Sequence, residues 1–347
     1  MSGRTILLTG ASGVVGQALL PRLLENGGDV KVVALVHRSP VPGYAVTSVR
    51  GDIAAPWFGL THEAYTRLAA KVDAVIHCAA VTDFNRTDGS LEATNVTGTQ
   101  NMVAFAEQAG ATLYHVSTAF VNTTVDGDRG STAVGYAASK AAAEQVLRTS
   151  GVPHVVFRPS VVIGDSESGV ISAFQGLHQV VAGLFAGMMP MIPFDARWPI
   201  DFIPSDIVAD AIATVVEKDV SDGEYWITAG EQALRLDEAM DLAVAYAAEL
   251  GVDLDTPRFV PPDLFDRLIG PVFLEALPER IKSSVLRMLE FFTTYLQSGA
   301  RMPSSLDELA NLGVMELPDQ RDSLTNNLHY WADYKGHCSC DQTRRVA

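Results

Sequence analysis

The sequence predicts an α/β fold: a doubly wound parallel Rossmann-type sheet with a smaller, mainly helical substrate domain. Short apolar runs alternate with helix-forming stretches over the first half of the chain, as is typical of a parallel sheet covered on both faces. A glycine-rich turn follows the first apolar run, and the regular alternation stops after Pro159. The length of 347 residues allows roughly two domains.

The individual elements follow from this alternation. Uninterrupted apolar runs predict buried strands at Thr5–Leu8, Val30–Val36, Val72–His77, Leu113–Ser117 and Val155–Arg158. Helical patterns between them lie at Val14–Asn26, Thr61–Ala70, Ser90–Ala109 and Tyr136–Thr149. Beyond Pro159 we expect an apolar helix or helix pair at Val170–Met189, a short strand at Ile200–Ile203, a helix at Ile207–Glu217 and a last strand at Tyr225–Thr228.

This order of elements suggests how the domains are divided. The chain is expected to return to the sheet near Ile200 and Tyr225, so the second domain would be built from two insertions. We therefore assign residues 1–163 and 200–230 to the Rossmann domain, and residues 164–199 and 231–347 to the substrate domain.

Composition and charge exclude several classes of protein. Hydrophobic residues make up 48% and charged residues 19%, which argues against disorder. The net charge of −16 repels phosphate backbones and argues against nucleic acid as a partner. The longest apolar stretch, Val180–Pro193, is too short and too broken to span a bilayer, so no membrane insertion is expected.

The cysteines and the first residues bear on location and metal binding. Three cysteines form no disulfide framework and favour a reducing compartment, and no signal-peptide pattern precedes the first strand. A cytoplasmic location is expected. His337, Cys338 and Cys340 lack a second ligand cluster, so no metal site is expected. The sequence leaves the oligomeric state open.

The glycine-rich turn predicts a dinucleotide site. It follows the first strand and opens the first helix, where glycines allow a tight turn and close backbone approach to a pyrophosphate. The helix N-terminus would present free N–H groups to the anion. The candidate contacts are Gly10, Ser12, Gly13, Val14, Val15 and Gly16.

The second strand ends at His37 and Arg38 without the carboxylate that takes ribose hydroxyls in many dinucleotide sites. Arg38 is a candidate partner for a 2′-phosphate, which favours NADP(H) over NAD(H); the alternative is a solvated surface residue. Asp52 and Ile53 lie where a third strand ends. Asp52 would contact the adenine or cap the next turn.

Tyr136 and Lys140 are four residues apart, which places both on one face of a helix. A free tyrosine has a pKa of about 10, and a nearby ammonium lowers it by favouring the phenolate. The lysine would also hold the nicotinamide ribose, and the tyrosine would exchange a proton with a carbonyl or alcohol oxygen. Ser117 and Thr118 end a strand at the edge of the sheet where ligands bind.

The order and spacing of these motifs resemble the extended short-chain dehydrogenase/reductases over residues 5–228. The flanking residues look most like the NADPH-dependent thioester-reductase and fatty-acyl-reductase branch. The motifs are the glycine turn, His77–Ala80, Asn95–Thr99, Ser117–Thr118, Tyr136 with Lys140, Arg158–Ser160 and Asp201–Asp206. The branch is indicated by His77–Phe84, Val116–Asn122 and Asp201–Asp206.

The resemblance implies roles by position. Thr118 would be the catalytic hydroxyl, with Ser117 as the second choice, and Tyr136 and Lys140 would complete a catalytic triad. Ala79 and Ala80 would form a close wall for the cofactor. The other implied cofactor contacts are Asn95, Ser117, Tyr136, Lys140, Pro159, Ser160, Val161 and Val162.

The leading hypothesis is an NADPH-dependent reductase of a free or carrier-bound acyl thioester or of the derived aldehyde. An NAD-dependent nucleotide-sugar epimerase or dehydratase is an alternative, against which Arg38 and Asn122 argue. A dehydrogenase or ketone reductase for a small hydrophobic substrate and a non-catalytic NADP(H)-sensing scaffold are further alternatives. Apolar side chains within Ile171–Pro193 would line an acyl channel or form ordinary core.

Overall fold

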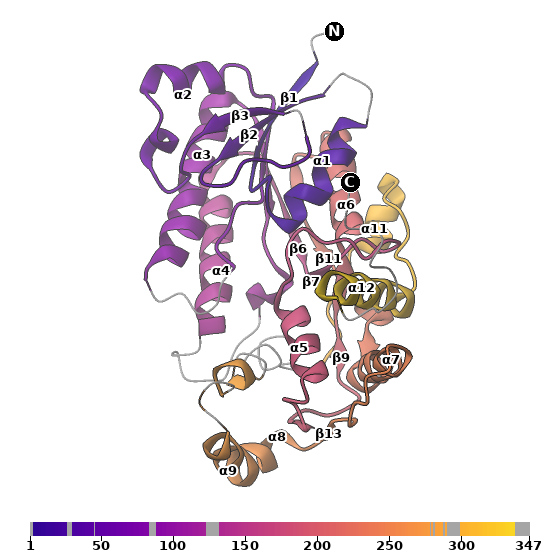
Figure 1. The fold of residues 1–347 in the computed structure, drawn as a ribbon. Helices are drawn as coiled ribbons and strands as arrows, with labels where there is room; N and C mark the ends of the chain where they lie inside the picture. The colour runs from indigo at the N-terminus through magenta and orange to yellow at the C-terminus, as the bar shows by residue number, and fades with distance from the viewer. Residues whose placement is uncertain are drawn as a thin grey trace. The chain divides into compact units, whose positions relative to one another are not determined.

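The computed structural model describes residues 3–25, 30–44, 46–82, 88–122, 132–277, 279, 282–286, 289 and 299–336 (Figure 1). The chain forms two compact units, each assembled from three segments. Unit 1 comprises Met1–Val162, Ser205–Thr228 and Pro303–Glu316, and unit 2 comprises Ile163–Pro204, Ala229–Met302 and Leu317–Ala347.

Unit 1 contains a seven-stranded parallel sheet in the order β3-β2-β1-β4-β5-β6-β11, which confirms the predicted fold class. Its strands are β1 (Arg4–Thr9), β2 (Val30–Val36), β3 (Thr47–Arg50), β4 (Ala74–His77), β5 (Thr112–Val116), β6 (His154–Pro159) and β11 (Asp222–Ile227). The strand order reverses between β1 and β4. Ligands of doubly wound sheets bind at such a reversal, beyond the carboxyl ends of the strands.

Helices cover both faces of this sheet. One group consists of α2 (His62–Ala69), α3 (Gly98–Ala109) and α4 (Thr132–Ser150), and the other of α1 (Val14–Leu24) and α6 (Ser205–Glu217) (Figure 1). Short η1 (Pro56–Gly59) and η3 (Ala119–Asn122) turns and strand β7 (Val161–Ile163) complete the connections.

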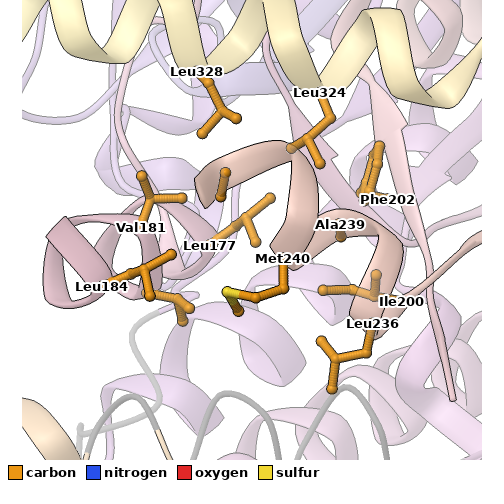
Figure 2. A pocket seen from close by; sticks show the side chains of 12 residues that line it. Leu177, Val181, Leu184, Ile200, Phe202, Leu236, Ala239, Met240, Leu324 and Leu328 are labelled. Atoms are coloured by element: carbon orange, nitrogen blue, oxygen red, sulfur yellow. The ribbon is translucent and has the colours of Figure 1, made fainter. Parts of the chain in front are cut away.

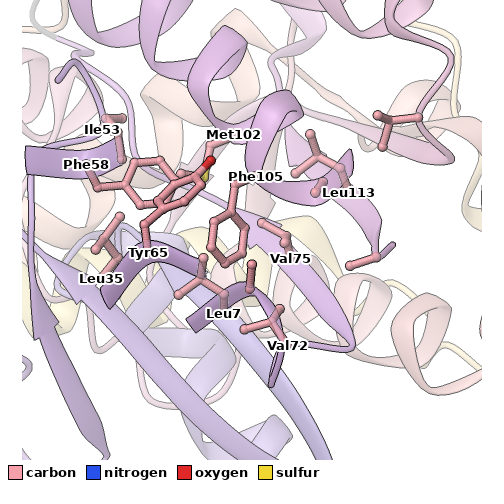
Figure 3. Close-up of a cluster of buried hydrophobic side chains, with 14 of the residues drawn as sticks. Leu7, Leu35, Ile53, Phe58, Tyr65, Val72, Val75, Met102, Phe105 and Leu113 are labelled. Atoms are coloured by element: carbon pink, nitrogen blue, oxygen red, sulfur yellow. The ribbon is translucent and has the colours of Figure 1, made fainter. Parts of the chain in front are cut away.

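A buried cluster joins the sheet to the α2–α4 face (Figure 3). The rings of Phe58, Tyr65 and Phe105 lie 5.2–5.4 Å apart between centroids. Leu7 and Val75 meet these rings from β1 and β4. Neighbouring residues alternate between the two faces of a strand, so a continuous apolar run such as Ile6–Leu8 serves both helix layers.

The predicted helix Ser90–Ala109 contains an irregularity that its sequence pattern did not reveal. Its first part, η2 (Glu92–Thr97), is a π-helical turn, and regular α-helix begins at Gly98. Such turns often occur at functional sites. Here the turn carries Asn95, whose buried side chain bonds outside its own helix.

The edge strand β11 is covered by a segment that the sequence-based division had assigned to the substrate domain. Ser305 N–H donates to Trp226 O at 2.8 Å, and Ser305 Oγ accepts from Trp226 N–H at 3.0 Å. Thr228 Oγ1 donates to Pro303 O at 2.6 Å. Helix α11 (Leu306–Leu312) follows. Residues 303–316 therefore protect an otherwise open sheet edge, and their place in unit 1 differs from the expected division.

Unit 2 is mainly helical, with α5 (Gly176–Phe185), α7 (Leu236–Glu249) and α12 (Gln320–Lys335) as its longer described helices. Its shorter elements are β8 (Met191–Ile192), β9 (Pro199–Ile200), β10 (Phe202–Pro204), η4 (Gly230–Gln232), β12 (Leu234–Arg235), β13 (Arg258–Phe259), α8 (Pro262–Leu264), η5 (Phe265–Ile269) and α9 (Gly270–Ala276).

Two sequence-based expectations in this region were wrong. The expected strand Ile200–Ile203 is two short strands separated by Asp201, and Ile200 pairs with Leu234 of β12 instead of joining the large sheet. Asp201 causes the break because its carboxylate accepts hydrogen bonds from the backbone N–H groups of Ala229 and Gly230, both at 2.9 Å. In addition, only Gly176–Phe185 of the expected helical stretch Val170–Met189 is α-helical.

Candidate active site

The turn between β1 and α1 has no space for side chains at two of its glycines. Gly10 has a φ of +70°, and a Cβ there would lie 2.6 Å from Ala79 N. A Cβ on Gly16 would lie 2.2 Å from Gly10 O. Ser12 and Gly13 are exposed at the start of α1. This close-packed backbone cradle fits a pyrophosphate, which the N–H groups of a helix N-terminus stabilise.

The end of β2 places an exposed Arg38 beside the same edge of the sheet. His37 Nε2 lies 3.7 Å from Asp52 Oδ2. Asp52 Oδ1 accepts a hydrogen bond from Ala54 N–H at 2.9 Å, so this residue does cap the following turn. Ile53 is buried against Gly98 at the start of α3.

The end of β4 is fixed to β1 by hydrogen bonds. Thr9 Oγ1 accepts from Ala79 N–H at 3.2 Å and lies 2.7 Å from Nδ1 of His77. His77 is 1% exposed, and burial, together with the charge of Lys140, lowers its pKa to about 3. His77 is therefore neutral at physiological pH. Ala79 and Ala80 are half-buried beyond the strand.

Tyr136, Thr118 and Lys140 are all buried in unit 1. Burial raises the pKa of Tyr136 to about 12, and the nearby Thr118 hydroxyl offsets only part of this rise. Lys140, one helical turn further along α4, donates from Nζ to Val116 O at 2.7 Å.

The expected lowering of the Tyr136 pKa by Lys140 was wrong for this arrangement. Desolvation disfavours the phenolate more strongly than the surrounding groups favour it. Burial also lowers the pKa of Lys140 to about 8, against the opposing Coulomb interactions with Glu144 and Cys78. Tyr136 is consequently a phenol at neutral pH, in the protonation state of a proton donor.

Ser117, the neighbour of Thr118, makes different contacts. Its hydroxyl donates to Glu144 Oε1 at 2.6 Å. Arg158 binds the same carboxylate in a bidentate manner, with Nε at 3.0 Å from Oε1 and an amino nitrogen at 2.7 Å from Oε2. Because the Ser117 proton is used inside the protein, the geometry favours Thr118 over Ser117 as the reactive hydroxyl.

Asn95 connects the π-helical turn to α4. Its side-chain oxygen accepts from Val81 N–H at 2.8 Å, and its Nδ2 donates to Ser139 Oγ at 2.9 Å. Ser139 Oγ in turn donates to Tyr136 O at 2.7 Å. The side chain of Asn95 thus ties the backbone of Tyr136 to the chain after β4.

The segment after β6 was expected to meet the nicotinamide carboxamide. Ser160 is 5% exposed, and its N–H donates to Ile227 O at 3.1 Å. Within the described part of the chain its buried hydroxyl has no hydrogen-bond partner. Val161 and Val162 are buried, and Pro159 ends the strand. The structure does not describe residues 83–87 and 337–347, so the expectations for Asp83, Phe84, His337, Cys338 and Cys340 lie outside it. The Asn122 side chain is not described either.

Sequence reasoning missed the charged cluster behind the site. Glu144 receives hydrogen bonds from Ser117, Arg158 and Arg148, and Arg158 also binds Glu224 of β11 at 2.7 Å. Arg158 lies over the ring of Trp226, 4.9 Å from its centroid. The one available signal was the four-residue spacing of Tyr136, Lys140 and Glu144, which places all three on one helix face.

Unit 2 contains an apolar pocket with a cavity volume of about 40 Å³. Leu324 and Leu328 of α12 point toward side chains of α5 and α7, and Met240 lies among them (Figure 2). Of the side chains singled out as channel or core, Leu177 and Leu184 line this pocket.

The parallel sheet, its glycine cradle and the buried tyrosine–lysine pair define the class: an oxidoreductase domain of the extended short-chain dehydrogenase/reductase type. Residues 44–212 match the profile of an NAD-binding family described as male sterility protein. Residues 44–212 are therefore similar to this family, and the resemblance seen in the sequence is confirmed.

Known proteins resemble the chain beyond this domain. The terminal R domain from the myxalamid PKS-NRPS biosynthetic pathway is 26% identical, with 98% of this chain and 93% of that chain covered and a TM-score of 0.75. A reductase domain of a nonribosomal peptide synthetase from Mycobacterium tuberculosis shares the fold at 21% identity, with 96% and 92% covered and a TM-score of 0.72.

A curated relative, the hybrid PKS-NRPS synthetase pvhA of Talaromyces variabilis, is 31% identical over 233 residues. The match covers 62% of this chain and 6% of that protein. A polyketide synthase-nonribosomal peptide synthetase of Aspergillus clavatus and the hybrid PKS-NRPS synthetase xenE of Xenoacremonium sinensis also match, and the chain spans 6% of each. None of the described helices combines the length and the apolar character needed to cross a membrane.

Proposed function

We propose that this chain is an NADPH-dependent reductase of acyl thioesters or of the derived aldehydes, and that a carrier protein delivers the acyl group. The observation that carries the proposal is the burial of Tyr136 near the Thr118 hydroxyl, with Lys140 one helical turn further along α4. The similarity to terminal reductase domains of PKS-NRPS systems supports the substrate class.

The residues present fit a dinucleotide. Gly10, Gly13 and Gly16 would hold the pyrophosphate in the backbone cradle, and Arg38 would meet the 2′-phosphate. Lys140 would hold the nicotinamide ribose, and the hydroxyl of Ser160 would meet a polar group of the nicotinamide. When bound, NADPH supplies hydride to the substrate carbonyl carbon.

The protein's own groups would act on the carbonyl oxygen. Tyr136 is protonated at neutral pH and donates its proton to the oxygen as negative charge develops. Thr118 adds a second donor, and each such donor contributes roughly 2.7–4 kcal/mol to transition-state stabilisation. For a thioester, the resulting hemithioacetal collapses to aldehyde and thiol, and a second reduction gives the alcohol.

The test is incubation of the purified protein with carrier-bound and free acyl thioesters, and with the matching aldehydes, while absorbance reports oxidation of NADPH or NADH. We expect oxidation of NADPH with thioester, and its loss in Tyr136→Phe. Absence of NADPH oxidation across the panel would overturn the proposal. NAD+ retained tightly through purification would instead favour the nucleotide-sugar epimerase or dehydratase alternative.

Cofactor choice is tested separately by Arg38→Ala. If Arg38 binds the 2′-phosphate, the KM for NADPH rises about 10–100-fold and that for NADH changes little, because a hydrogen bond to a charged group contributes about 1.5–3 kcal/mol. Arg67→Ala, on an exposed helix surface, is the matched control. Equal effects on both cofactors would contradict the assignment of NADP(H).

A further inference from the structure

The ammonium group of Lys140 is hydrogen-bonded to two residues of β5. Lys140 is 2% exposed, and its Nζ lies 2.7 Å from Val116 O and 3.2 Å from Nε2 of His115. His115 is 1% exposed, and its side chain was not among the expected site residues. A lysine ammonium is only a donor, so both neighbours must accept from it.

This contact decides which nitrogen of His115 carries the ring proton. Nε2 has to be unprotonated to accept from Lys140, so the proton sits on Nδ1. Nδ1 then has no acceptor within the described residues. That arrangement is less costly than two donors facing each other at 3.2 Å. Burial and the charge of Lys140, together with His77 and His154, lower the pKa of His115 well below its ordinary value, which keeps the ring neutral.

The neighbouring His77 has the opposite tautomer. Thr99 Oγ1 donates to Asn95 O, so it accepts from Nε2 of His77 across 3.4 Å. Nδ1 of this neutral ring is therefore unprotonated and accepts from the Thr9 hydroxyl at 2.7 Å. The rings of His77 and His115 lie 5.2 Å apart. Both nitrogens of His77 are therefore used elsewhere, and His115 alone of the two contacts Lys140.

We propose that His115 is a positioning residue, which accepts a hydrogen bond from Lys140 at Nε2 and thereby keeps this lysine cationic and directed toward the cofactor ribose. The inference rests on the proposed role of Lys140 in the proposed function. Val116 O and His115 take two of the three ammonium protons, and the third is directed to the ribose.

The other groups around Lys140 set the background for its titration. Glu144 lies one turn further along α4, Cys78 follows β4, His77 ends β4, and His115 is the penultimate residue of β5. Glu144 and Cys78 favour the ammonium, whereas burial opposes it. His115 is an uncharged acceptor. Replacing it with an apolar residue therefore lowers the pKa of Lys140 further, without altering the charge of any neighbour.

The first experiment measures the titration of Lys140 directly, without substrate or cofactor. NMR of protein labelled with 13C at the lysine Cε is followed against pH, and Lys140→Arg assigns the resonance. In His115→Leu we expect the titration midpoint to fall by about one to two pH units, because a hydrogen bond to a charged group is lost. His115→Gln, whose amide oxygen can accept in place of Nε2, restores the midpoint.

The matched control is His178→Gln, a buried histidine of unit 2, which leaves the Lys140 midpoint unchanged. Equal midpoints in the wild type and His115→Leu, or equal shifts in His115→Leu and His115→Gln, overturn the proposal. If His115→Leu fails to fold, as judged by near-UV circular dichroism, the histidine tautomers of the wild-type protein still test the proposal. The 15N spectrum of labelled histidine must show His115 protonated on Nδ1 and His77 on Nε2, and any other pattern for His115 overturns the proposal.

Activity provides the second readout. If the protein reduces thioesters, the rate of His115→Leu declines at lower pH than that of the wild type, and His115→Gln restores the profile. A merely structural role lowers the rate at all pH values and leaves the profile in place, which contradicts the proposal. Because the NMR titration needs no turnover, absence of any reductase activity refutes the proposed function and leaves the Lys140–His115 contact to be judged on its own.

Discussion

At the scale of single residues, two adjacent hydroxyls have separate roles. The Ser117 proton is donated to Glu144, whereas the Thr118 hydroxyl lies near the phenol of Tyr136. From the sequence both hydroxyls were candidates, because both end the same strand. The difference depends on Glu144, which is 27 residues away in sequence, and no local pattern encodes that contact.

Substitution separates these two roles. In Thr118→Val we expect kcat to fall about 10²–10³-fold, because one donor to the developing oxyanion is lost. In Ser117→Ala we expect a nearly unchanged kcat and a free energy of unfolding lower by about 1–3 kcal/mol, because Glu144 loses a buried donor. Steady-state kinetics and urea denaturation measure both variants. The reverse pattern would make Ser117 the catalytic hydroxyl.

The residues that sequence reasoning predicted and those it missed differ in the range of their contacts. The glycine turn and the Tyr136–Lys140 spacing are local features, so they can be recognised from the sequence alone. His115 and Arg158 were missed as site residues because their roles depend on partners brought together by the sheet. Even for Tyr136 the local pattern was insufficient, since burial determines the direction of its pKa shift.

At the scale of elements, the turn between β1 and α1 depends on a contact that excludes a single methyl group. In Gly16→Ala the Cβ would meet backbone atoms of Gly10 and Ala11, and backbone cannot move aside as a flexible side chain can. We expect the free energy of unfolding to fall by about 1–3 kcal/mol and dinucleotide binding to be lost.

A matched control exists in another helix. Gly135 of α4 has only an ordinary contact, in which a Cβ would lie 3.8 Å from Leu91 Cδ1. Gly135→Ala should therefore keep or raise the stability, since alanine favours a helix by about 1 kcal/mol over glycine. Thermal unfolding monitored by circular dichroism compares the two variants. Equal melting temperatures would show that the β1–α1 turn tolerates a side chain.

Helix α4 is attached to β5 and β6 through Glu144. Burial by itself raises the pKa of this carboxyl, but the hydrogen bonds from Arg158 and Ser117 and the charges of Arg158 and Arg148 outweigh it, so the pKa lies below its ordinary value. A lowered folded-state pKa means that the ionised group stabilises the fold above the unfolded-state pKa. This stabilisation is lost as the pH falls through the folded-state pKa.

Glu144→Gln tests this linkage. At pH 7 we expect a loss of about 3–5 kcal/mol in the free energy of unfolding, because Arg158 would lose its buried bidentate carboxylate and keep only the half-exposed Glu224. The difference in the free energy of unfolding between the wild type and the variant should become smaller as the pH falls below the ordinary pKa range of a carboxyl group. Glu63→Gln, in an exposed pair with Arg67, should cost no more than about 0.5 kcal/mol. Denaturant titrations over a pH series provide the measurement, and a constant gap would contradict the linkage.

At the scale of the whole molecule, the sequence predicted unit 1 better than unit 2. Parallel strands buried on both faces give continuous apolar runs, and six of the seven strands were located directly or to within a few residues. Unit 2 relies on two-residue strand pairs such as β9 with β12 and on polar breaks such as Asp201, which leave no periodic pattern. The cover of β11 by residues 303–316 was missed for the same reason.

The interleaved order of the segments makes unit 1 dependent on distant parts of the chain. A fragment of residues 1–162 contains the glycine turn and Tyr136 but lacks β11 and α6. It would expose β6 as a sheet edge along His154–Pro159, leave α1 without its α6 neighbour, and deprive Arg158 of Glu224. We expect this fragment to aggregate, because an open edge beside uncovered apolar surface templates further strand pairing.

The measurement is size-exclusion chromatography and near-UV circular dichroism of the fragment and of the full chain. The full chain should elute without aggregates and show the near-UV aromatic signals of a fixed core. The fragment should aggregate and lose these signals. A control fragment ending at residue 336 retains all three segments of unit 1 and should behave as the full chain does. The opposite outcome is a 1–162 fragment that does not aggregate and that unfolds cooperatively on heating. It would show that the glycine cradle and the Tyr136 helix are stable without β11, and that the site folds without the distant segments.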